Sequence, residues 1–492
     1  MITSLQKDVQ KSPVKMTHRI SSLVCFSVAH VSTTYVPLLK TAPPRSFDAQ
    51  DVLVSAMPQD VAFLTTWSFS SSFLNPYSTT YRTLFFFIRQ FYRYQLLFCH
   101  IFAILLVSLK RITDQLYTER RFENVSTRER NKKGIITMKN LVILGGGYGG
   151  MRILLRLLPN QLPEDIQITL LDRVPYHSLK TEFYALAAGT ISDSHVRVTF
   201  PEHPRLHVKY GEVTGVDINE KLIHIKDEES IMYDDLVIGL GCEDKYHNVP
   251  GAKEFTCSIQ SIDNARETNQ RLNNLPAGAT VSIVGAGLSG VELASELHES
   301  RPDLQIKIFD RGNHILSAFP EKLSVYVENW FDKNEIEIIN NSNITRVEEN
   351  VLFNNDQPVQ SDVVVWTAGI QPNKVIRDLD VEKDGGGRVV LTTQHNLPND
   401  EHVYVVGDCA SLPHAPSAQL AEGQAEQIVQ VLLKRWKGEA PPTEFPKIKL
   451  KGVLGSLGKK EGFGLVAEHP LTGRVPRMLK SGVLWMYKYH NG

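Results

Sequence analysis

The stretch NLVILGGGYGG, residues 140–150, carries the strongest structural signal in this chain. Its first residues are apolar and predict a buried strand, and three glycines follow with the spacing G-x-G-x-x-G: Gly145, Gly147 and Gly150. In such a turn the first glycine allows the tight bend, the second lets backbone approach a pyrophosphate, and the third lets the next helix pack closely on the strand. A second apolar strand ends at Asp172, 22 residues after Gly150, and a carboxylate there can accept hydrogen bonds from ribose hydroxyls. The stretch therefore predicts a strand, a turn and a helix that bind a dinucleotide.

The same pattern returns in residues 280–310, where the three glycines are Gly285, Gly287 and Gly290. The strand that follows ends at Asp310, 20 residues after Gly290. Two copies at nearly equal spacing indicate an internal repeat of a binding unit, rather than two unrelated turns. A carboxylate beside the ribose 2′-hydroxyl repels the extra phosphate of NADP, so Asp310 favours NADH. We interpret the neighbouring Arg311 as a solvated surface residue.

The composition is that of a globular protein with more than one domain. A chain of 492 residues suffices for two or three domains, and 42% hydrophobic with 22% charged residues is ordinary. The net charge of −1 provides no positive field for phosphates, so no nucleic-acid partner is expected. The five cysteines include no C-x-x-C pair, so neither a metal site nor a thioredoxin-like redox pair is predicted. Their scatter favours a reducing, cytoplasmic compartment.

The first 137 residues differ from the rest of the chain. Residues 1–110 contain no Glu and show no sustained helical or strand period. We interpret 1–137 as an N-terminal extension that is either disordered or not native, because the codons for Lys132, Lys133 and Gly134 resemble a bacterial ribosome-binding site just before Met138. In the alternative interpretation, residues 92–109 form a weak membrane-spanning segment, although a spanning helix needs roughly 20 apolar residues.

Three further motifs agree with the repeat. YDDLVIGLG, residues 233–241, is similar to the strand and turn that end the first FAD segment of two-dinucleotide-binding flavoproteins of the pyridine nucleotide-disulfide oxidoreductase type. VVVWTAG, residues 363–369, resembles their second such motif and ends at Gly369. VYVVGD, residues 403–408, resembles their late FAD motif, in which an aspartate, here Asp408 after Gly407, contacts the ribityl chain. The resemblance covers essentially all of residues 138–492.

This resemblance implies an α/β fold with two Rossmann-like dinucleotide-binding domains, the NADH domain inserted in the FAD domain. It implies FAD on the first unit and NADH on the second, with Val213 at the position that touches adenine through its backbone. We expect 138–250 to be the first part of the FAD-binding domain, 251–372 the NADH-binding domain, 373–445 the second part of the FAD-binding domain, and 446–492 a short C-terminal region for a membrane surface or a dimer.

More narrowly, the chain resembles the type II NADH dehydrogenases, and most closely their NADH dehydrogenase-like relatives of the Bacillus type. Glu292 matches the family glutamate that points toward nicotinamide and flavin; the alternative is an acid favoured by the helix N-terminus. Gln419, in AQLA, residues 418–421, matches the start of the quinone motif A-Q-x-A-x-Q. Gly423 then takes the place of the second glutamine, and Gln424 comes one residue late. The resemblance implies electron transfer from NADH through FAD to a quinone without proton pumping.

The departure at Gly423 leaves two alternatives, a flavoprotein with a non-quinone acceptor and a redox sensor without useful turnover. No C-x4-C pair of the disulfide reductases is present, so electrons must pass directly to an external acceptor. Residues 474–490 combine four basic residues with an aromatic and apolar set and no acid, which suits a helix lying on a membrane surface, here the inner face of the cell membrane. The alternative is a helix that packs on its own protein or on a second copy in a homodimer.

Overall fold

The computed structural model describes residues 138–159 and 161–491. The predicted N-terminal extension 1–137 and the weak membrane segment 92–109 lie outside the described residues. Within the described part, no helix is long and apolar enough to cross a membrane.

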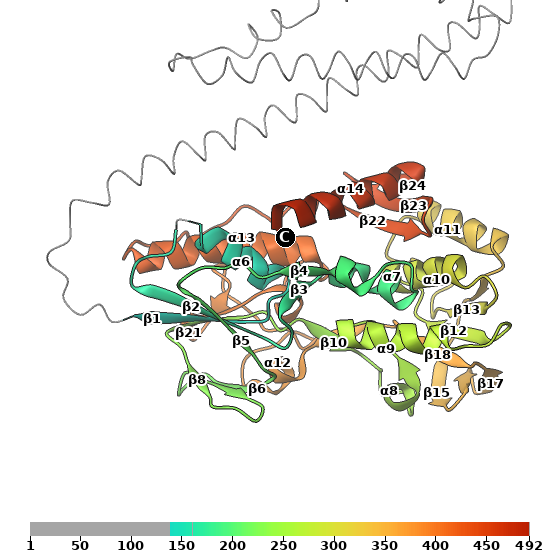
Figure 1. The fold of residues 1–492 in the computed structure, drawn as a ribbon, viewed down its shortest axis with the longest axis horizontal. Helices are drawn as coiled ribbons and strands as arrows, with labels where there is room; N and C mark the ends of the chain where they lie inside the picture. The colour runs from blue at the N-terminus through green and yellow to red at the C-terminus, as the bar shows by residue number, and fades with distance from the viewer. Residues whose placement is uncertain (1–137, 160, 492) are drawn as a thin grey trace, which may run out of the picture. The chain divides into compact units, whose positions relative to one another are not determined.

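The first sheet is six-stranded and draws on two separate parts of the chain (Figure 1). Its strand order is β20 (Asn396–Leu397), β21 (Asp400–Val405), β9 (Asp235–Ile238), β1 (Lys139–Leu144), β2 (Ile166–Asp172) and β5 (Leu206–Tyr210). All neighbours are parallel except β20 and β21. Successive side chains of β1 enter opposite cores, Leu141 and Ile143 on one face and Val142 and Leu144 on the other, as the pleat requires.

Helices cover one face of this sheet and small strands the other. The helices α6 (Tyr148–Leu157) and α13 (Ala418–Trp436) pack against each other above the sheet, as Figure 1 shows. Helix α13 begins where the Ser417 side chain accepts a hydrogen bond from the backbone of Leu420. The opposite face carries the three-stranded sheet of β6 (Val213–Asp217), β7 (Leu222–Ile225) and β8 (Ile231–Met232), with α12 (Lys374–Asp378) beside β6.

The second sheet is five-stranded and parallel, and its strands lie between β9 and β21 in the sequence. Its order is β11 (Thr256–Cys257), β18 (Val363–Trp366), β12 (Thr280–Val284), β13 (Gln305–Phe309) and β14 (Glu337–Ile339). The helices of this part are α8 (Ala252–Phe255), α9 (Ile262–Asn273), α10 (Leu288–Ser300) and α11 (Glu321–Lys333), and a hairpin sheet adds β15 (Ile344–Glu348), β16 (Val351–Asn354) and β17 (Gln357–Gln360). The chain enters and leaves along the antiparallel pair β10 (Cys242–Asp244) and β19 (Ile370–Pro372). The predicted fold, one Rossmann-like domain inserted in another, is confirmed.

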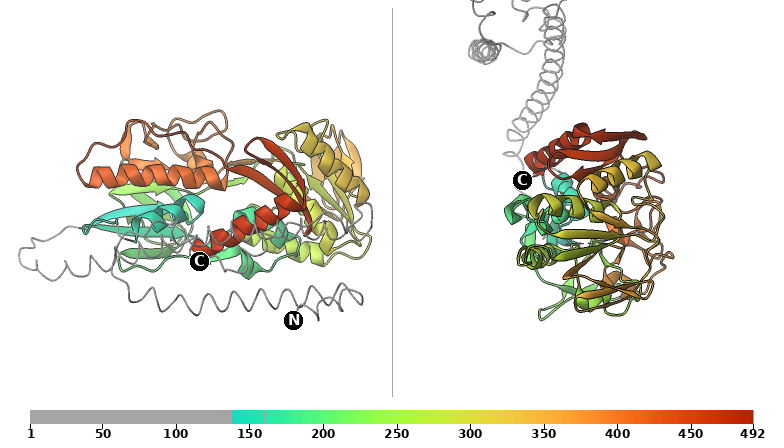
Figure 2. Two further views of the ribbon diagram at one scale, coloured as in Figure 1. Left: turned by 90° about the horizontal axis from the view of Figure 1, so that it is seen from above. Right: turned by 90° about the vertical axis from the view of Figure 1, so that its right-hand side faces the viewer.

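The C-terminal region is a small antiparallel sheet followed by a helix. It comprises β22 (Gly452–Leu457), β23 (Glu461–Val466), β24 (His469–Gly473) and α14 (Arg474–Asn491). Helix α14, red in Figure 2, packs on β22 and β23. Between the two domains run short elements: β3 (Tyr176–Ser178), η2 (Lys180–Glu182), α7 (Phe183–Ala187), η3 (Asp193–Val196) and β4 (Arg197–Thr199); the turn η4 (Gly407–Cys409) follows β21.

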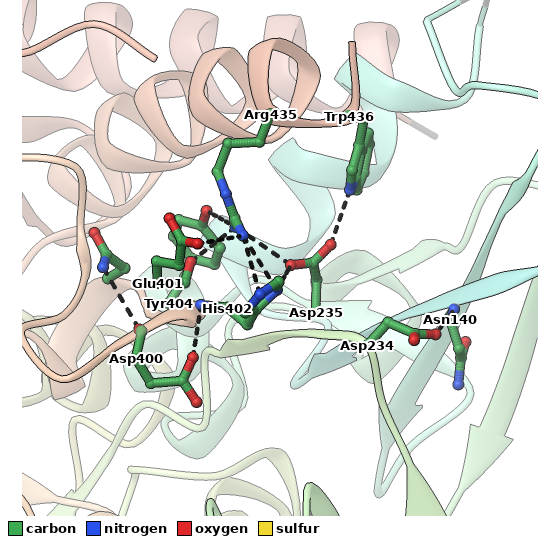
Figure 3. A network of polar contacts seen from close by, with 10 residues as sticks. Asn140, Asp234, Asp235, Asp400, Glu401, His402, Tyr404, Arg435 and Trp436 are labelled. Carbon is green, nitrogen blue, oxygen red and sulfur yellow. Dashed lines mark hydrogen bonds and ion pairs between the residues drawn. The ribbon is translucent and has the colours of Figure 1, made fainter. Parts of the chain in front are cut away.

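A buried carboxylate joins the two parts of the first domain (Figure 3). Asp235, at the start of β9, accepts hydrogen bonds from His402 Nδ1 at 2.9 Å, Arg435 Nη1 at 3.3 Å and Trp436 Nε1 at 2.8 Å. These partners lie on β21 and at the end of α13. Because dinucleotides bind beyond the carboxyl ends of parallel strands, this network at the opposite end of β9 is structural.

Candidate functional site

The first glycine turn lies between β1 and α6. A Cβ on Gly145 would collide with the Gly239 carbonyl, and one on Gly150 with the Gly145 carbonyl, so both positions require glycine. A Cβ on Gly147 would meet no heavy atom within 4 Å. Asp172, at the end of β2, accepts hydrogen bonds from the backbone of Gly146 at 2.6 Å and of Val174 at 3.0 Å. The turn therefore leaves an open space in front of Gly147, beside a fixed carboxylate.

The second glycine turn repeats this geometry between β12 and α10. Gly285 has φ +106° and Gly290 lies against its carbonyl, whereas a Cβ on Gly287 would meet nothing within 4 Å. Asp310 accepts hydrogen bonds from the backbone of Ala286 at 2.9 Å and of Gly312 at 2.7 Å. The Thr367 hydroxyl, in the VVVWTAG motif, donates to the Gly285 carbonyl at 2.8 Å. It caps the turn from the end of β18.

The remaining predicted cofactor contacts follow strands of both sheets or lie in the small sheet of β6. Val213 begins β6 and pairs with Ile225. Gly407 has φ +77°, and its N–H donates to Gln424 Oε1 at 2.8 Å. Gly369 has φ +135° and lies at the start of the return path to the first domain. Both glycines therefore occupy left-handed backbone that favours glycine.

Asp408 belongs to a polar cluster that the sequence did not reveal. Lys180 Nζ donates to Cys242 Sγ at 3.0 Å, and the Cys242 thiol donates to Asp408 Oδ2 at 3.0 Å. Burial raises the pKa of Cys242 to about 12, so the thiol stays protonated at neutral pH. Burial alone would lower the pKa of Lys180, but Cys242 and Asp408 raise it, so the ammonium stays charged. The cluster places one fixed positive charge beside Asp408.

Glu292 lies in a second buried cluster, at the junction of α10, β22, α7 and α14. Its side chain is only 3% exposed, and Oε1 accepts hydrogen bonds from the backbone of Ser456 at 2.9 Å and from Lys480 Nζ. Lys480 also donates to the Tyr184 hydroxyl at 2.7 Å and lies 3.9 Å from Glu182 Oε1. One ammonium is thus shared by two carboxylates and a phenol.

The protonation of this cluster is set by burial and by Lys480. Burial raises the pKa of Glu292 to about 7, because desolvation of the carboxylate outweighs the nearby ammonium. Burial alone would lower the pKa of Lys480, but Glu292, Tyr184 and Glu182 raise it above its usual value. Lys480 therefore stays charged at neutral pH while Glu292 can gain or lose a proton. A carboxyl group with a pKa near the working pH is suited to acid–base chemistry.

The three residues of the imperfect quinone motif have different surroundings. Gln419 is exposed, and its amide bonds the backbone of Lys451 and Gly452, each at 2.8 Å. Gln424 is fully buried and holds the backbone of Gly407 and Val405. A Cβ on Gly423 would collide with Ile448, which explains physically why a glutamine does not fit there.

A buried histidine links α14 to the first glycine turn. His177 Nδ1 lies 2.8 Å from the Gly146 carbonyl, and Nε2 lies 2.9 Å from the Tyr487 hydroxyl. Burial lowers the pKa of His177 to about 4, so the ring is neutral at physiological pH. A carbonyl can only accept, so Nδ1 carries the hydrogen and Nε2 accepts from Tyr487. Helix α14 therefore contacts both halves of the site, through Tyr487 and through Lys480.

Comparisons with known proteins agree with this geometry. The family model described as pyridine nucleotide-disulphide oxidoreductase matches residues 139–425. The chain is 72% identical over 355 residues to the NADH dehydrogenase-like protein YutJ of Bacillus subtilis (strain 168), which is 72% of this chain and 100% of that relative. It is 24% identical over 380 residues to a type II NADH:quinone oxidoreductase of Staphylococcus saprophyticus, which is 70% of this chain and 93% of that relative.

Solved structures share the fold. One is NDH2 from Plasmodium falciparum in complex with NADH, with a TM-score of 0.63, 17% identity, and coverage of 72% of this chain and 96% of that one. Another is the sulfide:quinone oxidoreductase from Aquifex aeolicus, with a TM-score of 0.61, 18% identity, and coverage of 72% and 92%. At these identities the likeness concerns the fold alone.

Proposed function

Because the chain belongs to the pyridine nucleotide-disulphide oxidoreductase family, we propose that it is an FAD-dependent NADH dehydrogenase that passes electrons to a quinone without proton pumping. The observation that carries the proposal is the repeated turn, in which Gly147 and Gly287 each face open space beside a carboxylate. The names of the relatives, NADH dehydrogenase-like protein and type II NADH:quinone oxidoreductase, support the direction of electron flow.

The residues of the first turn fit FAD. The N-terminus of α6 offers free N–H groups for a pyrophosphate at Gly147, where no side chain obstructs it. Asp172 is held by two backbone hydrogen bonds and retains lone pairs for a ribose. We assign the backbone of Val213 to adenine, and Gly407 and Asp408 to the ribityl chain.

The residues of the second turn fit NADH. Gly287 at the N-terminus of α10 is open to a pyrophosphate, and the Asp310 carboxylate would repel a 2′-phosphate, so NADH is preferred over NADPH. We assign Gly285, Gly290 and Gly369 to the backbone turns that shape this site. Their positive φ angles or close packing make them intolerant of side chains.

Bound FAD supplies the capacity to accept a hydride from NADH and to give electrons to a quinone. The chain orients the two dinucleotides and provides a proton. Reduction of a quinone consumes two protons, and we assign Glu292 as the group that holds one, because burial brings its pKa to about 7. Lys480 keeps the deprotonated form of Glu292 compensated. We retain Gln419 as a candidate quinone contact, although its amide already bonds backbone groups.

The test is an anaerobic titration of the purified chain that follows flavin absorbance. Addition of NADH is expected to bleach the flavin, and a menaquinone analogue is expected to restore it within one turnover. Bleaching without recovery would contradict the quinone assignment. It would favour the second candidate, an NADH-oxidising flavoprotein with another acceptor or a sensor, which the collision between a Cβ on Gly423 and Ile448 supports.

We also propose that the protein lies peripherally on the inner face of the cell membrane, with α14 as the contact. The helix exposes a set of large apolar residues and carries no acid in its first turn. The exposed set comprises Val475, Met478, Leu479, Val483, Trp485, Met486 and Tyr489. A basic helix with such a face suits the membrane interface. A homodimer through the same face is the alternative. Flotation with vesicles tests membrane binding, and sedimentation without vesicles tests the dimer.

A further inference from the structure

A pocket outside the dinucleotide turns lies between α14 and the segment of η3 and β4. Its volume is about 420 Å³, and its lining includes Ser194, His195, Arg197, Trp485, Lys488 and Tyr489. None of these residues belongs to a glycine turn or to the cluster around Glu292. The pocket is therefore separate from the dinucleotide turns and from the cluster around Glu292.

Lys488, in the lining of the pocket, is a cation with no ion pair within 4.0 Å among the described residues. Arg197 pairs with Asp193, and Asp193 also pairs with Arg266 Nη2 at 3.0 Å. Arg266 has a second acid, Asp263, at 2.5 Å, so these two arginines and two aspartates balance. Lys488 has no hydrogen bond or ion pair to any other residue in 138–159 and 161–491. Partial burial lowers the pKa of Lys488 although the more distant Glu182 raises it, so Glu182 compensates the ammonium only in part.

The outer wall of the pocket is aromatic and exposed. The rings of Trp485 and Tyr489 stack with centroids 5.4 Å apart at 15°. Their side chains are 67% and 69% exposed, and they continue into the apolar face of α14 defined above. Tryptophan and tyrosine favour the boundary between headgroups and acyl chains, since each ring is apolar with one polar atom. The site thus offers a cation for an anion and an apolar path leading away from it.

We propose that this pocket binds the phosphate of an anionic phospholipid headgroup through Lys488, beside the ion-paired Arg197, with the acyl chains along the apolar face of α14. The inference rests on the membrane attachment proposed above and deepens it, because it makes that attachment selective for anionic lipid. Free phosphate shares the charge of the headgroup but lacks the apolar part that Trp485 and Tyr489 would cover.

The test is co-sedimentation of the full chain with vesicles of phosphatidylcholine alone or mixed with phosphatidylglycerol. Lys488→Gln is expected to weaken binding to the mixed vesicles about fivefold and to leave binding to phosphatidylcholine unchanged. Lys488→Arg should retain the native binding. The matched control is Lys253→Gln, which removes the same charge from an exposed site on α8 and should have no effect. Equal losses of vesicle binding in the two glutamine variants would overturn the proposed lipid site and leave only general charge attraction to the vesicles.

Two further measurements distinguish a phospholipid headgroup from free phosphate as the ligand of the pocket. Trp485→Gln should weaken binding to both kinds of vesicle, because it removes the apolar contact. Inorganic phosphate, titrated without vesicles, should leave the fluorescence that Trp485 contributes unchanged; saturable quenching that Trp485→Phe abolishes would replace the lipid with a free phosphate. A dimer that Trp485→Gln dissociates, without vesicle binding, would also overturn the proposal. Because neither assay needs turnover, failure here leaves the proposed NADH oxidation independently testable.

Discussion

The two glycine turns share their glycine spacing and carry opposite charges at one equivalent position. Two residues after the third glycine stands Arg152 in the first unit and Glu292 in the second. Each pairs with a helix from the C-terminal part of the chain. Arg152 bonds Glu422 of α13 at 2.5 Å with both side chains partly exposed, whereas Glu292 bonds Lys480 of α14 and is buried. The repeat thus gave two binding sites, and in the second one burial raises the pKa of Glu292 to about 7.

The largest expected effect separates the two turns. Gly147→Val should abolish FAD binding, because the side chain enters the open space where a pyrophosphate approaches backbone. Gly287→Val should abolish NADH binding and leave FAD bound. Flavin absorbance of the purified variants and NADH-driven bleaching measure the two losses. Loss of flavin from the Gly287 variant would show that the turns are not independent.

Replacement of Lys480 tests the ion pair of the second unit and leaves the Arg152–Glu422 pair of the first unit in place. Lys480→Met leaves the Glu292 carboxylate buried without compensation, so the free energy of unfolding above pH 7 should fall by about 3 kcal/mol. The pKa of Glu292 is raised from 4.5 to about 7 in the fold, so this group stabilises the protein below pH 4.5 and loses that contribution as pH rises through about 7. Without Lys480 that loss should extend to higher pH. Urea unfolding over a pH series measures it, with Lys480→Arg as the control; parallel native and Met curves would contradict it.

Exchange of Glu292 tests its chemical role directly. Glu292→Gln should leave NADH-driven bleaching intact and slow turnover with a menaquinone analogue about 100-fold. The pH dependence of turnover near 7 should disappear with it. Arg152→Gln is the equivalent change in the first unit and should cost at most about 1 kcal/mol of stability with no change in turnover. Equal turnover in native and Glu292→Gln proteins would remove this carboxyl group from the mechanism.

The smallest effect concerns Gly423. Gly423→Gln forces Ile448 to move and should lower the unfolding free energy by about 2 kcal/mol. The double variant with Ile448→Ala, which makes room for the glutamine, should recover most of the lost unfolding free energy. If the double variant also turns over quinone faster, the departure from the quinone motif limits the native rate. Thermal unfolding and quinone kinetics on the same samples decide this.

The sequence predicted the fold and both turns because these depend on local backbone demands. Gly145 and Gly150 contact each other within one turn, so their spacing alone reveals the geometry. The partners of Glu292 and Asp408 were not predictable in this way. Lys480 lies 188 residues from Glu292, and Lys180 lies 62 residues from Cys242, with no spacing that marks either contact. The displaced Gln424 was recognised as a departure, but only the structure shows that it serves Gly407.

The hydrogen bonds from Gly146 through His177 to Tyr487 have a consequence for biosynthesis. The glycine turn that they complete is the first motif of the repeat to leave the ribosome, yet Tyr487 follows His177 by 310 residues. The early turn therefore acquires this contact only after the 310 residues that follow His177 have been synthesised. Nascent chains stalled before α14 would lack the hydrogen bond from Tyr487 to His177, and the first glycine turn would reach its complete structure only once α14 has folded.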